Sequence, residues 1–208
     1  RPVPRSRGHR RVIDEGYTKY ECDWQQAPAL PETAIEDLNA WRNQLHEQGL
    51  IGYYPEHGVG FGNVSIREGD SDRFIISGTQ TGHIAHTDER HYARVTACDI
   101  GANRVVCEGP VQASSEALTH AAIYALDPGI RAVVHVHNAD LWHALIDRIP
   151  TTSREISYGT PEMAREFQRL YADTDFRAQG IAVMGGHEEG IVSFGKDINQ
   201  AADRILHL

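Results

Sequence analysis

The feature that most constrains this chain is a short apolar run, Ala132–His137, that ends in two alternating histidines. Its small and β-branched residues are typical of a buried strand. Because alternate side chains of a strand point to the same face, His135 and His137 project together while Val136 turns into the core. Two imidazoles at this spacing can reach one cation. The sequence therefore predicts a metal site at the end of a sheet strand, where open α/β proteins place their ligands.

A catalytic zinc site usually takes three protein ligands and leaves one position open. The third candidate is His187, which follows a short apolar segment and the pair Gly185-Gly186, whose small size lets backbone approach closely. Glu188 and Glu189 are rivals that we expect to be solvated loop charges. The remaining histidines fit less well, being terminal, on helices without a ligand partner, or together in one loop as candidates for substrate contact: His9, His207, His46, His143, His83 and His86.

Helical and strand patterns are interspersed along the chain, which indicates an α/β fold. Apolar spacing and capping residues predict helices over residues 33–49, 87–94, 114–126, 138–146, 160–171 and 197–206. The expected caps include Thr87, Ser114 and Thr160. Apolar runs predict strands over residues 74–77, 95–100, 104–108, 132–137, 181–184 and 191–194. Hairpin-like pairs among them predict a sheet that is not purely parallel.

We expect one domain over residues 33–208, preceded by an N-terminal arm over residues 1–32. The chain of 208 residues is long enough to bury a core and shows no internal repeat. Residues 1–11 hold five arginines and no acidic residue. They are expected to form a solvated tail, with a basic docking arm as the alternative. Residues 12–31 are polar and are expected to pack irregularly on the domain.

Composition excludes several classes of function. A formal charge of −9 argues against a nucleic-acid-binding surface, because phosphates are neutralised by basic residues. The chain has no apolar run long enough to span a membrane and no recognisable secretory signal, so a cytoplasmic protein with reduced thiols at Cys22, Cys98 and Cys107 is expected. Neither of its two lysines, Lys19 and Lys196, lies in a promising pocket segment. Carbonyl chemistry would therefore use a metal rather than a Schiff base.

Three further motifs offer polar groups suited to a substrate. Ser114-Ser115-Glu116 opens a predicted helix, where free backbone N–H groups can hold an anion and Glu116 can reach a metal. Ser114 as an ordinary cap is the simpler alternative. Residues 62–65 (GNVS) and 79–82 (TQTG) offer an amide, hydroxyls and backbone donors.

The order of these motifs resembles the class II aldolase/adducin family. GNVS, SGTQTG, SSE, HVH and the late His187 follow one another as they do in that family, and the resemblance covers about residues 33–206. It implies a single α/β/α domain with a central, mainly antiparallel sheet. It also implies a homotetramer with active sites between subunits, which acts on a small-molecule substrate.

Residue roles follow from the same resemblance. His135, His137 and His187 would bind Zn²⁺, with another divalent transition metal left open. Glu116 would be the catalytic acid/base and a further ligand of the resting site. A phosphate pocket would be formed by Asn63, Thr81, Gly82, Ser114 and Ser115.

The chain departs from the family pattern in two segments. Aldolase members carry a tyrosine proton donor ahead of a Gly-Thr pair, whereas this position holds Arg154 or Glu155, and Tyr158 is displaced. Many members have glycine directly after the last ligand, whereas here Glu188 and Glu189 intervene. Tyr158 and Tyr171 remain candidate proton donors, and Arg154 a candidate contact to an anionic substrate.

The expected activity is that of a zinc-dependent aldolase. This lyase would cleave or form a C–C bond in a small hydroxylated, phosphorylated carbonyl compound through a metal-stabilised enediolate. Glu116 would move the proton, with a pKa raised toward neutrality. A dehydratase or 4-epimerase of a sugar phosphate with the same site is the first alternative. A non-catalytic adducin-like scaffold is the second.

Overall fold

The computed structural model describes Glu15 and residues 17–208. Its centre is an eight-stranded sheet in the order β1-β7-β6-β5-β4-β8-β10-β9. Within this sheet of the described residues, only β1 and β7 pair in parallel; all other neighbours are antiparallel. The strands are β1 (Glu21–Gln26), β4 (Asn63–Arg67), β5 (Phe74–Ser77), β6 (Tyr92–Asp99), β7 (Arg104–Gly109), β8 (Ala132–His137), β9 (Ile181–Val183) and β10 (Gly190–Gly195). The expected α/β/α architecture with a mainly antiparallel sheet is confirmed.

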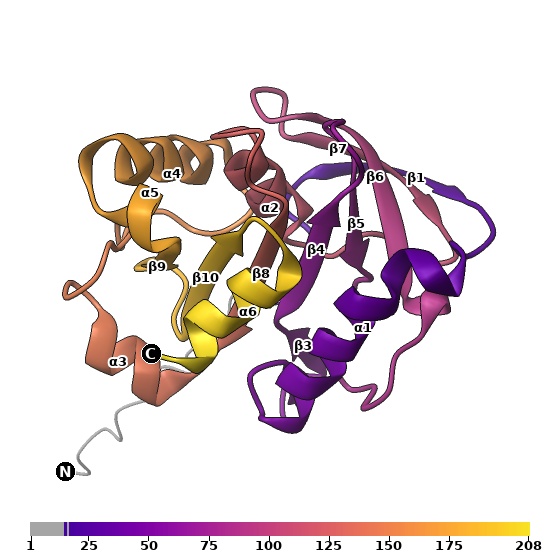
Figure 1. The fold of residues 1–208 in the computed structure, drawn as a ribbon, viewed down its shortest axis with the longest axis horizontal. Coiled ribbons are helices and arrows are strands. Elements are labelled where there is room, and N and C mark those ends of the chain that lie inside the picture. The colour runs from indigo at the N-terminus through magenta and orange to yellow at the C-terminus, as the bar shows by residue number, and fades with distance from the viewer. Residues whose placement is uncertain (1–14, 16) are drawn as a thin grey trace, which may run out of the picture.

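Helices cover both faces of the sheet. Figure 1 shows α1 (Glu32–Glu47) and α6 (Ile198–Leu206) on the near face, over β4, β8 and β10. Their apolar residues share one core with Val134 and Val136 of β8. The opposite face packs against α2 (Ala117–Tyr124), α4 (Pro161–Asp173) and α5 (Phe176–Gln179), in a core that includes Val133. Because side chains alternate along β8, His135 and His137 lie on the α2 side.

Side-chain caps fix the starts of three helices near the predicted positions, although only Thr160 was predicted as a cap. Asn138 accepts a hydrogen bond from the N–H of Leu141 (2.9 Å) at the start of α3 (Ala139–Leu145). Thr160 caps α4, whose first residue is a proline. Asp197 accepts from the N–H of Gln200 (2.7 Å) at the start of α6. These contacts satisfy backbone donors that a helix end leaves unpaired.

The prediction of a helix over residues 87–94 is wrong. A 3-10 turn forms at Glu89–His91 instead, and its cap is Asp88. Thr87 does not cap it, because Asp88 holds the cap position; the Thr87 hydroxyl instead donates to Asn39 (2.7 Å) and Asn43 (3.0 Å) of α1. The chain then continues directly as β6. The helix predicted over residues 114–126 is shorter, since α2 begins at Ala117 and ends at Tyr124. The prediction that Ser114 caps it is also wrong, because Glu116 holds the cap position and the Ser114 hydroxyl accepts from the N–H of Glu116 instead (3.2 Å).

Residues 12–31 were predicted to pack irregularly. This is wrong for Glu21–Gln26, which form β1 and pair with β7 in the sheet. The indole N–H of Trp24 donates to the carbonyl of Gly109 (3.1 Å), and the free thiols of Cys22 and Cys107 lie 3.9 Å apart. The expectations for residues 1–11 and His9 lie outside the described residues. Among the helices of the described residues, none is long and apolar enough to cross a membrane.

Residues 52–61 also form two short strands that were not predicted from the sequence. A hairpin of β2 (Gly52–Tyr54) and β3 (Val59–Phe61) precedes β4. Gly62, with φ of +81°, turns the chain from β3 into β4, and a Cβ there would lie 2.7 Å from the side chain of Ile51. This turn places Asn63 opposite His135 in the sheet.

Candidate metal centre

The structure brings the three predicted imidazole ligands together. The Nε2 atom of His137 lies 3.1 Å from that of His135 and 2.9 Å from that of His187. All three residues are at most 4% exposed. In a tetrahedral zinc site with Zn–N bonds of about 2.0 Å, two ligand nitrogens are about 3.3 Å apart. The cluster therefore has the size that one such ion requires.

Backbone packing explains how His187 reaches the other two. The loop after β9 packs against residues 152–156 so closely that a Cβ on Gly185 would lie 2.2 Å from the carbonyl oxygen of Thr152. A Cβ on Gly186 would lie 2.0 Å from that of Ile156. Any other residue at either position would push the loop outward. The two glycines are needed for this close approach, as the sequence predicts.

Partners on the outer side orient two of the rings. Nδ1 of His135 lies 3.1 Å from the carbonyl oxygen of Ile191, so it carries the proton and donates. Nδ1 of His137 lies 3.1 Å from the hydroxyl of Tyr54, which itself donates to Glu189. Both rings therefore turn a lone pair on Nε2 toward the centre. This arrangement is typical of metal-binding histidines.

Two buried carboxylates complete the cluster. Oε2 of Glu116 lies 3.0 Å from Nε2 of His135. Oε2 of Glu15 lies 2.7 Å from Nε2 of His187 and 2.9 Å from that of His137. Glu15, His135, His137 and His187 each offer a ligand atom within 4.8 Å of the others. Glu15 was not predicted from the sequence, because it lies in a polar segment without periodicity or any metal-binding spacing.

The neighbouring imidazoles lower the pKa of both carboxylates and so favour their ionised form. Burial disfavours the charge on Glu116, but the neighbouring His135 outweighs burial and lowers its pKa to about 2. The expectation of a raised pKa is therefore wrong. Burial likewise opposes the charge on Glu15, yet His137 and His187 hold its pKa well below the usual range.

The two buried carboxylates, Glu15 and Glu116, need a positive charge beside them. Burial lowers the pKa of His137, which favours the neutral ring. Two carboxylates without a cation would be costly in so dry a site. Among the described residues, Oε1 of Glu116 and Oε2 of Glu15 are buried and receive no hydrogen bond. The donor set of three imidazoles and two carboxylates therefore fits a divalent transition metal.

A chain of hydrogen bonds leads from Glu116 into the core. The amide N–H of Asn63 donates to Oε2 of Glu116 (2.8 Å), so the amide oxygen must accept from Nε2 of His120 (2.5 Å). Nδ1 of His120 then accepts from the hydroxyl of Ser65 (2.6 Å), which lies 2.7 Å from that of Tyr124. Burial lowers the pKa of His120 to about 3 and keeps it neutral. His120 was not singled out from the sequence, where only the spacing Glu116-x-x-x-His120 could have indicated it.

The predicted phosphate-binding residues line one cavity beside the cluster. Asn63, Thr81, Gly82, Ser114 and Ser115 all contribute to its wall, together with Glu15. Hydrogen bonds from Ser114 N–H to the carbonyl of Ser77 (3.1 Å) and from Thr79 N–H to that of Gln112 (2.9 Å) hold the two loops together. Their roles in binding remain predictions.

Of the other candidates from the sequence, Glu189 and Tyr158 lie beside the cluster and Tyr171 and Arg154 do not. Glu189 is half-buried and accepts the Tyr54 hydroxyl, so it is not simply a solvated charge. The hydroxyl of Tyr158 donates to the carbonyl of Tyr17 (2.9 Å), although its ring contacts that of His187. Tyr171 bonds to Asp127 and Arg154 to Asp147, away from the cluster.

Fold and site together define an α/β/α protein with a buried cluster of histidines and carboxylates that could hold one metal ion. The chain belongs to the family described as the Class II Aldolase and Adducin N-terminal domain, whose model matches residues 56–208. No curated protein matches the chain.

Several solved structures share the fold. An L-fuculose 1-phosphate aldolase has a TM-score of 0.63 and 17% identity, covering 86% of this chain and 84% of its own. The L-fuculose-1-phosphate aldolase from Thermus thermophilus has a TM-score of 0.56 and 19% identity, covering 82% and 83%. The sugar-phosphate aldolase from Thermotoga maritima has a TM-score of 0.63 and 16% identity, covering 84% and 90%. At these identities the likeness supports the fold.

Proposed function

We propose that this protein is a zinc-dependent lyase that cleaves or forms a C–C bond in a small hydroxylated, phosphorylated carbonyl compound. The observation that carries the proposal is the meeting of three imidazole Nε2 atoms and the Glu116 carboxylate next to a cavity rich in hydroxyl and amide donors. Family membership supports the same reaction class.

His135, His137 and His187 would hold the ion, with Glu116 at its side. A divalent metal at this point polarises a carbonyl oxygen and offsets the negative charge that forms on the substrate. The outer bonds of His135 and His137 would fix their rings for this task. We propose zinc because most of the proposed ligand atoms are imidazole nitrogens.

Glu116 is the residue proposed to move the proton. As an ionised carboxylate it accepts a proton from the substrate, and the protonated form returns it to the carbon that carried the broken bond. The N–H of Asn63 holds one carboxylate oxygen at 2.8 Å, which leaves Oε1 for the proton. Asn63 thus positions Glu116 in addition to lining the cavity.

The cavity beside the cluster is proposed to bind the phosphate. Ser114 and Ser115 lie just before α2, and Thr81-Gly82 faces them across the cavity wall. Hydroxyls and backbone N–H groups in this arrangement suit an anion.

We also propose that the protein is cytoplasmic and forms a homotetramer. The mass of the purified protein in solution would test the number of subunits.

Product analysis distinguishes the reactions that such a site can support. Metal-loaded protein is incubated with a panel of ketose phosphates, and products are separated by mass and stereochemistry. Two shorter fragments support the lyase. Loss of water would indicate a dehydratase, and a C4 epimer an epimerase. Metal binding without turnover of any compound would instead favour a binding or scaffold protein.

The ligand set is tested by metal content. His135→Ala and His187→Ala are each expected to lose the ion during dialysis, while an exposed histidine variant, His143→Ala, keeps it. A fully metallated His187→Ala protein would refute the proposed ligands.

A further inference from the structure

Glu15 reaches the cluster from a segment that lies outside the matched family region. The segment, called the strap here, comprises Glu15 and residues 17–20. It ends where β1 begins, at the opposite end of the sheet order from β9 and β10. Its carboxylate is 2% exposed and lies against two imidazoles of the cluster.

Specific contacts hold the strap in place. The hydroxyl of Tyr158 accepts from the N–H of Tyr17 (3.1 Å) and donates to its carbonyl (2.9 Å). The hydroxyl of Tyr20 donates to the carbonyl of Ser114 (2.7 Å), which precedes α2. Asn103 binds the carbonyl of Lys19 (2.8 Å). The strap is therefore held both by the segment that precedes α2, at Ser114, and by the loop that carries Tyr158.

The two carboxylates are not held alike. Glu116 immediately precedes α2 in the core and is gripped by the amide of Asn63. The Glu15 carboxylate contacts the imidazoles, and the nearest fastening of its segment, within the described part of the chain, is the single hydroxyl of Tyr158. Of the two, Glu15 is the ligand that can leave without disturbing the core.

With the strap in place, little space is left for a substrate next to the imidazoles. The cavity that Glu15 lines has an accessible volume of about 30 Å³. A space of this size holds about one or two water molecules. Glu15 stands between this cavity and the imidazoles, where a carbonyl oxygen would have to bind.

The net charge of the metal centre also favours displacement of Glu15 by an anionic substrate. Two carboxylates neutralise a divalent ion, so the closed centre carries no net charge. Withdrawal of Glu15 leaves one positive charge beside the hydroxyl-rich loops. An anionic chelating compound is then attracted more strongly than it would be to the closed centre.

We propose that Glu15 is a removable metal ligand, and that a substrate with two oxygen donors must displace it to bind. This inference rests on the proposed metal site. The strap thereby selects compounds that chelate the ion through two adjacent oxygens over compounds that offer a single oxygen.

Cobalt and acetohydroxamate, a small chelator with two oxygen donors, test the proposal on the full chain. The wild type is compared with Glu15→Gln, with Tyr158→Phe, with the ligand variant His187→Ala, and with the control Glu21→Gln, which removes an exposed carboxylate of β1. The readouts are the visible spectrum of bound Co²⁺, cobalt affinity in competition with a chelating dye, and the Kd of acetohydroxamate. Circular dichroism checks that each variant folds.

Glu15→Gln is expected to change the cobalt spectrum and weaken cobalt binding about tenfold, because one charged ligand is lost. Acetohydroxamate should bind about tenfold more tightly, since the competing carboxylate is gone. Tyr158→Phe removes only the fastening and should give a smaller tightening with the carboxylate intact. Glu21→Gln should match the wild type.

An unchanged spectrum and unchanged acetohydroxamate affinity in Glu15→Gln would overturn the proposal. If His187→Ala still loses cobalt in the same experiment, the metal site stands and only the role of Glu15 falls. If His187→Ala binds cobalt like the wild type, the proposed metal site falls and this inference falls with it.

Discussion

Glu116 connects the predicted metal ligands to a buried hydrogen-bond chain. One of its oxygens contacts His135 (3.0 Å) and receives the amide N–H of Asn63 (2.8 Å). Its side chain is completely buried. Because of these contacts, a glutamine at this position is expected to stay in place without the negative charge. The substitution therefore tests the role of the carboxylate in proton transfer.

Glu116→Gln is expected to keep its metal, because three imidazoles and Glu15 remain. Turnover should fall by about 10²–10⁴, the usual contribution of a positioned acid or base. Metal content and kcat on the identified substrate measure the two effects. Glu188→Gln, next to His187 but exposed, is the control that should retain activity. Full activity in Glu116→Gln would show that another group moves the proton.

His120 predicts a pH dependence of stability. Its pKa is about 3 in the fold because of burial, against about 6.5 in the unfolded chain. Between these values the unfolded state binds a proton that the folded state does not. The free energy of unfolding is therefore not reduced by His120 above pH 6.5. It falls as the pH decreases toward 3, by at most about 1.4 kcal/mol per pH unit.

His120→Leu should remove this slope and cost about 2–4 kcal/mol at pH 7, since Asn63 and Ser65 lose buried partners. Urea unfolding of metal-free protein between pH 4 and 7 measures both quantities. The variant His143→Leu changes an exposed histidine and should keep the slope. A slope that persists in His120→Leu must come from other groups.

Single residues of the site were predictable in proportion to their local pattern. His135 and His137 follow from strand alternation, and Glu116 and His187 from motif and glycine context. Glu15 and His120 carry no such pattern, because their partners lie far away in the sequence. The ionised state of Glu116 also escaped prediction, since it depends on which charges surround the buried carboxylate.

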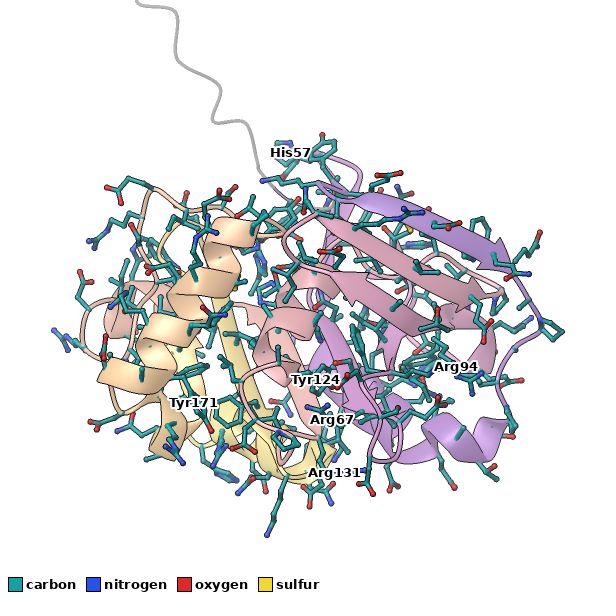
Figure 2. All side chains as sticks on the ribbon, turned by 90° about the horizontal axis from the view of Figure 1, so that it is seen from above. His57, Arg67, Arg94, Tyr124, Arg131 and Tyr171 are labelled. Carbon is teal, nitrogen blue, oxygen red and sulfur yellow. The ribbon has the colours of Figure 1, made fainter. Side chains whose placement is uncertain are left out.

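Among the elements, β4 and the end of α2 are joined by the buried Arg67. Its guanidinium donates to the carbonyls of Ile130 (2.8 Å) and Tyr124 (2.8 Å) and lies 4.9 Å from the ring of Tyr124. Figure 2 shows Arg67 and Tyr124 at this junction, with Arg94 farther along the sheet. The carbonyl of the last residue of α2, Tyr124, is thus satisfied by a side chain.

Arg67→Met is expected to lower the free energy of unfolding by about 3 kcal/mol, because several buried carbonyls lose a charged donor. Arg94→Met breaks half-buried ion pairs with Glu68 and Glu108 and should cost below about 1 kcal/mol. Denaturant unfolding compares them. Equal losses would mean that the Arg67 contacts add nothing beyond ordinary ion pairs.

Elements with a strong period were predicted well. The run Ala132–His137 is β8, and α3, α4 and α6 begin within one residue of their predicted starts at Asn138, Thr160 and Asp197. Short strands in glycine-rich or polar sequence, such as β1 and the β2–β3 hairpin, were missed. Their residues enter strands because neighbouring strands pair with them, which local propensity does not record.

At the scale of the whole molecule, the metal is expected to stabilise the fold. The two buried carboxylates need a cation, and an ion that binds only the folded state adds about 2.7 kcal/mol at a hundred times its Kd. For a chain of 208 residues this raises Tm by roughly 5–10 °C. Calorimetry with Zn²⁺ and after chelation measures the change. His187→Ala should show little response, and an equal response in that variant would place the ion elsewhere.

The sequence by itself determined the α/β class, the strand that presents two histidines, the late third histidine and the polar motifs around them. These follow from side-chain alternation, capping and glycine chemistry, which act over a few residues. Only the tertiary structure decided that β1 pairs with β7 and that Glu15 meets His137 and His187. Such contacts join segments more than a hundred residues apart in the case of Glu15, and their energy comes from burial and charge that exist only once the chain has packed.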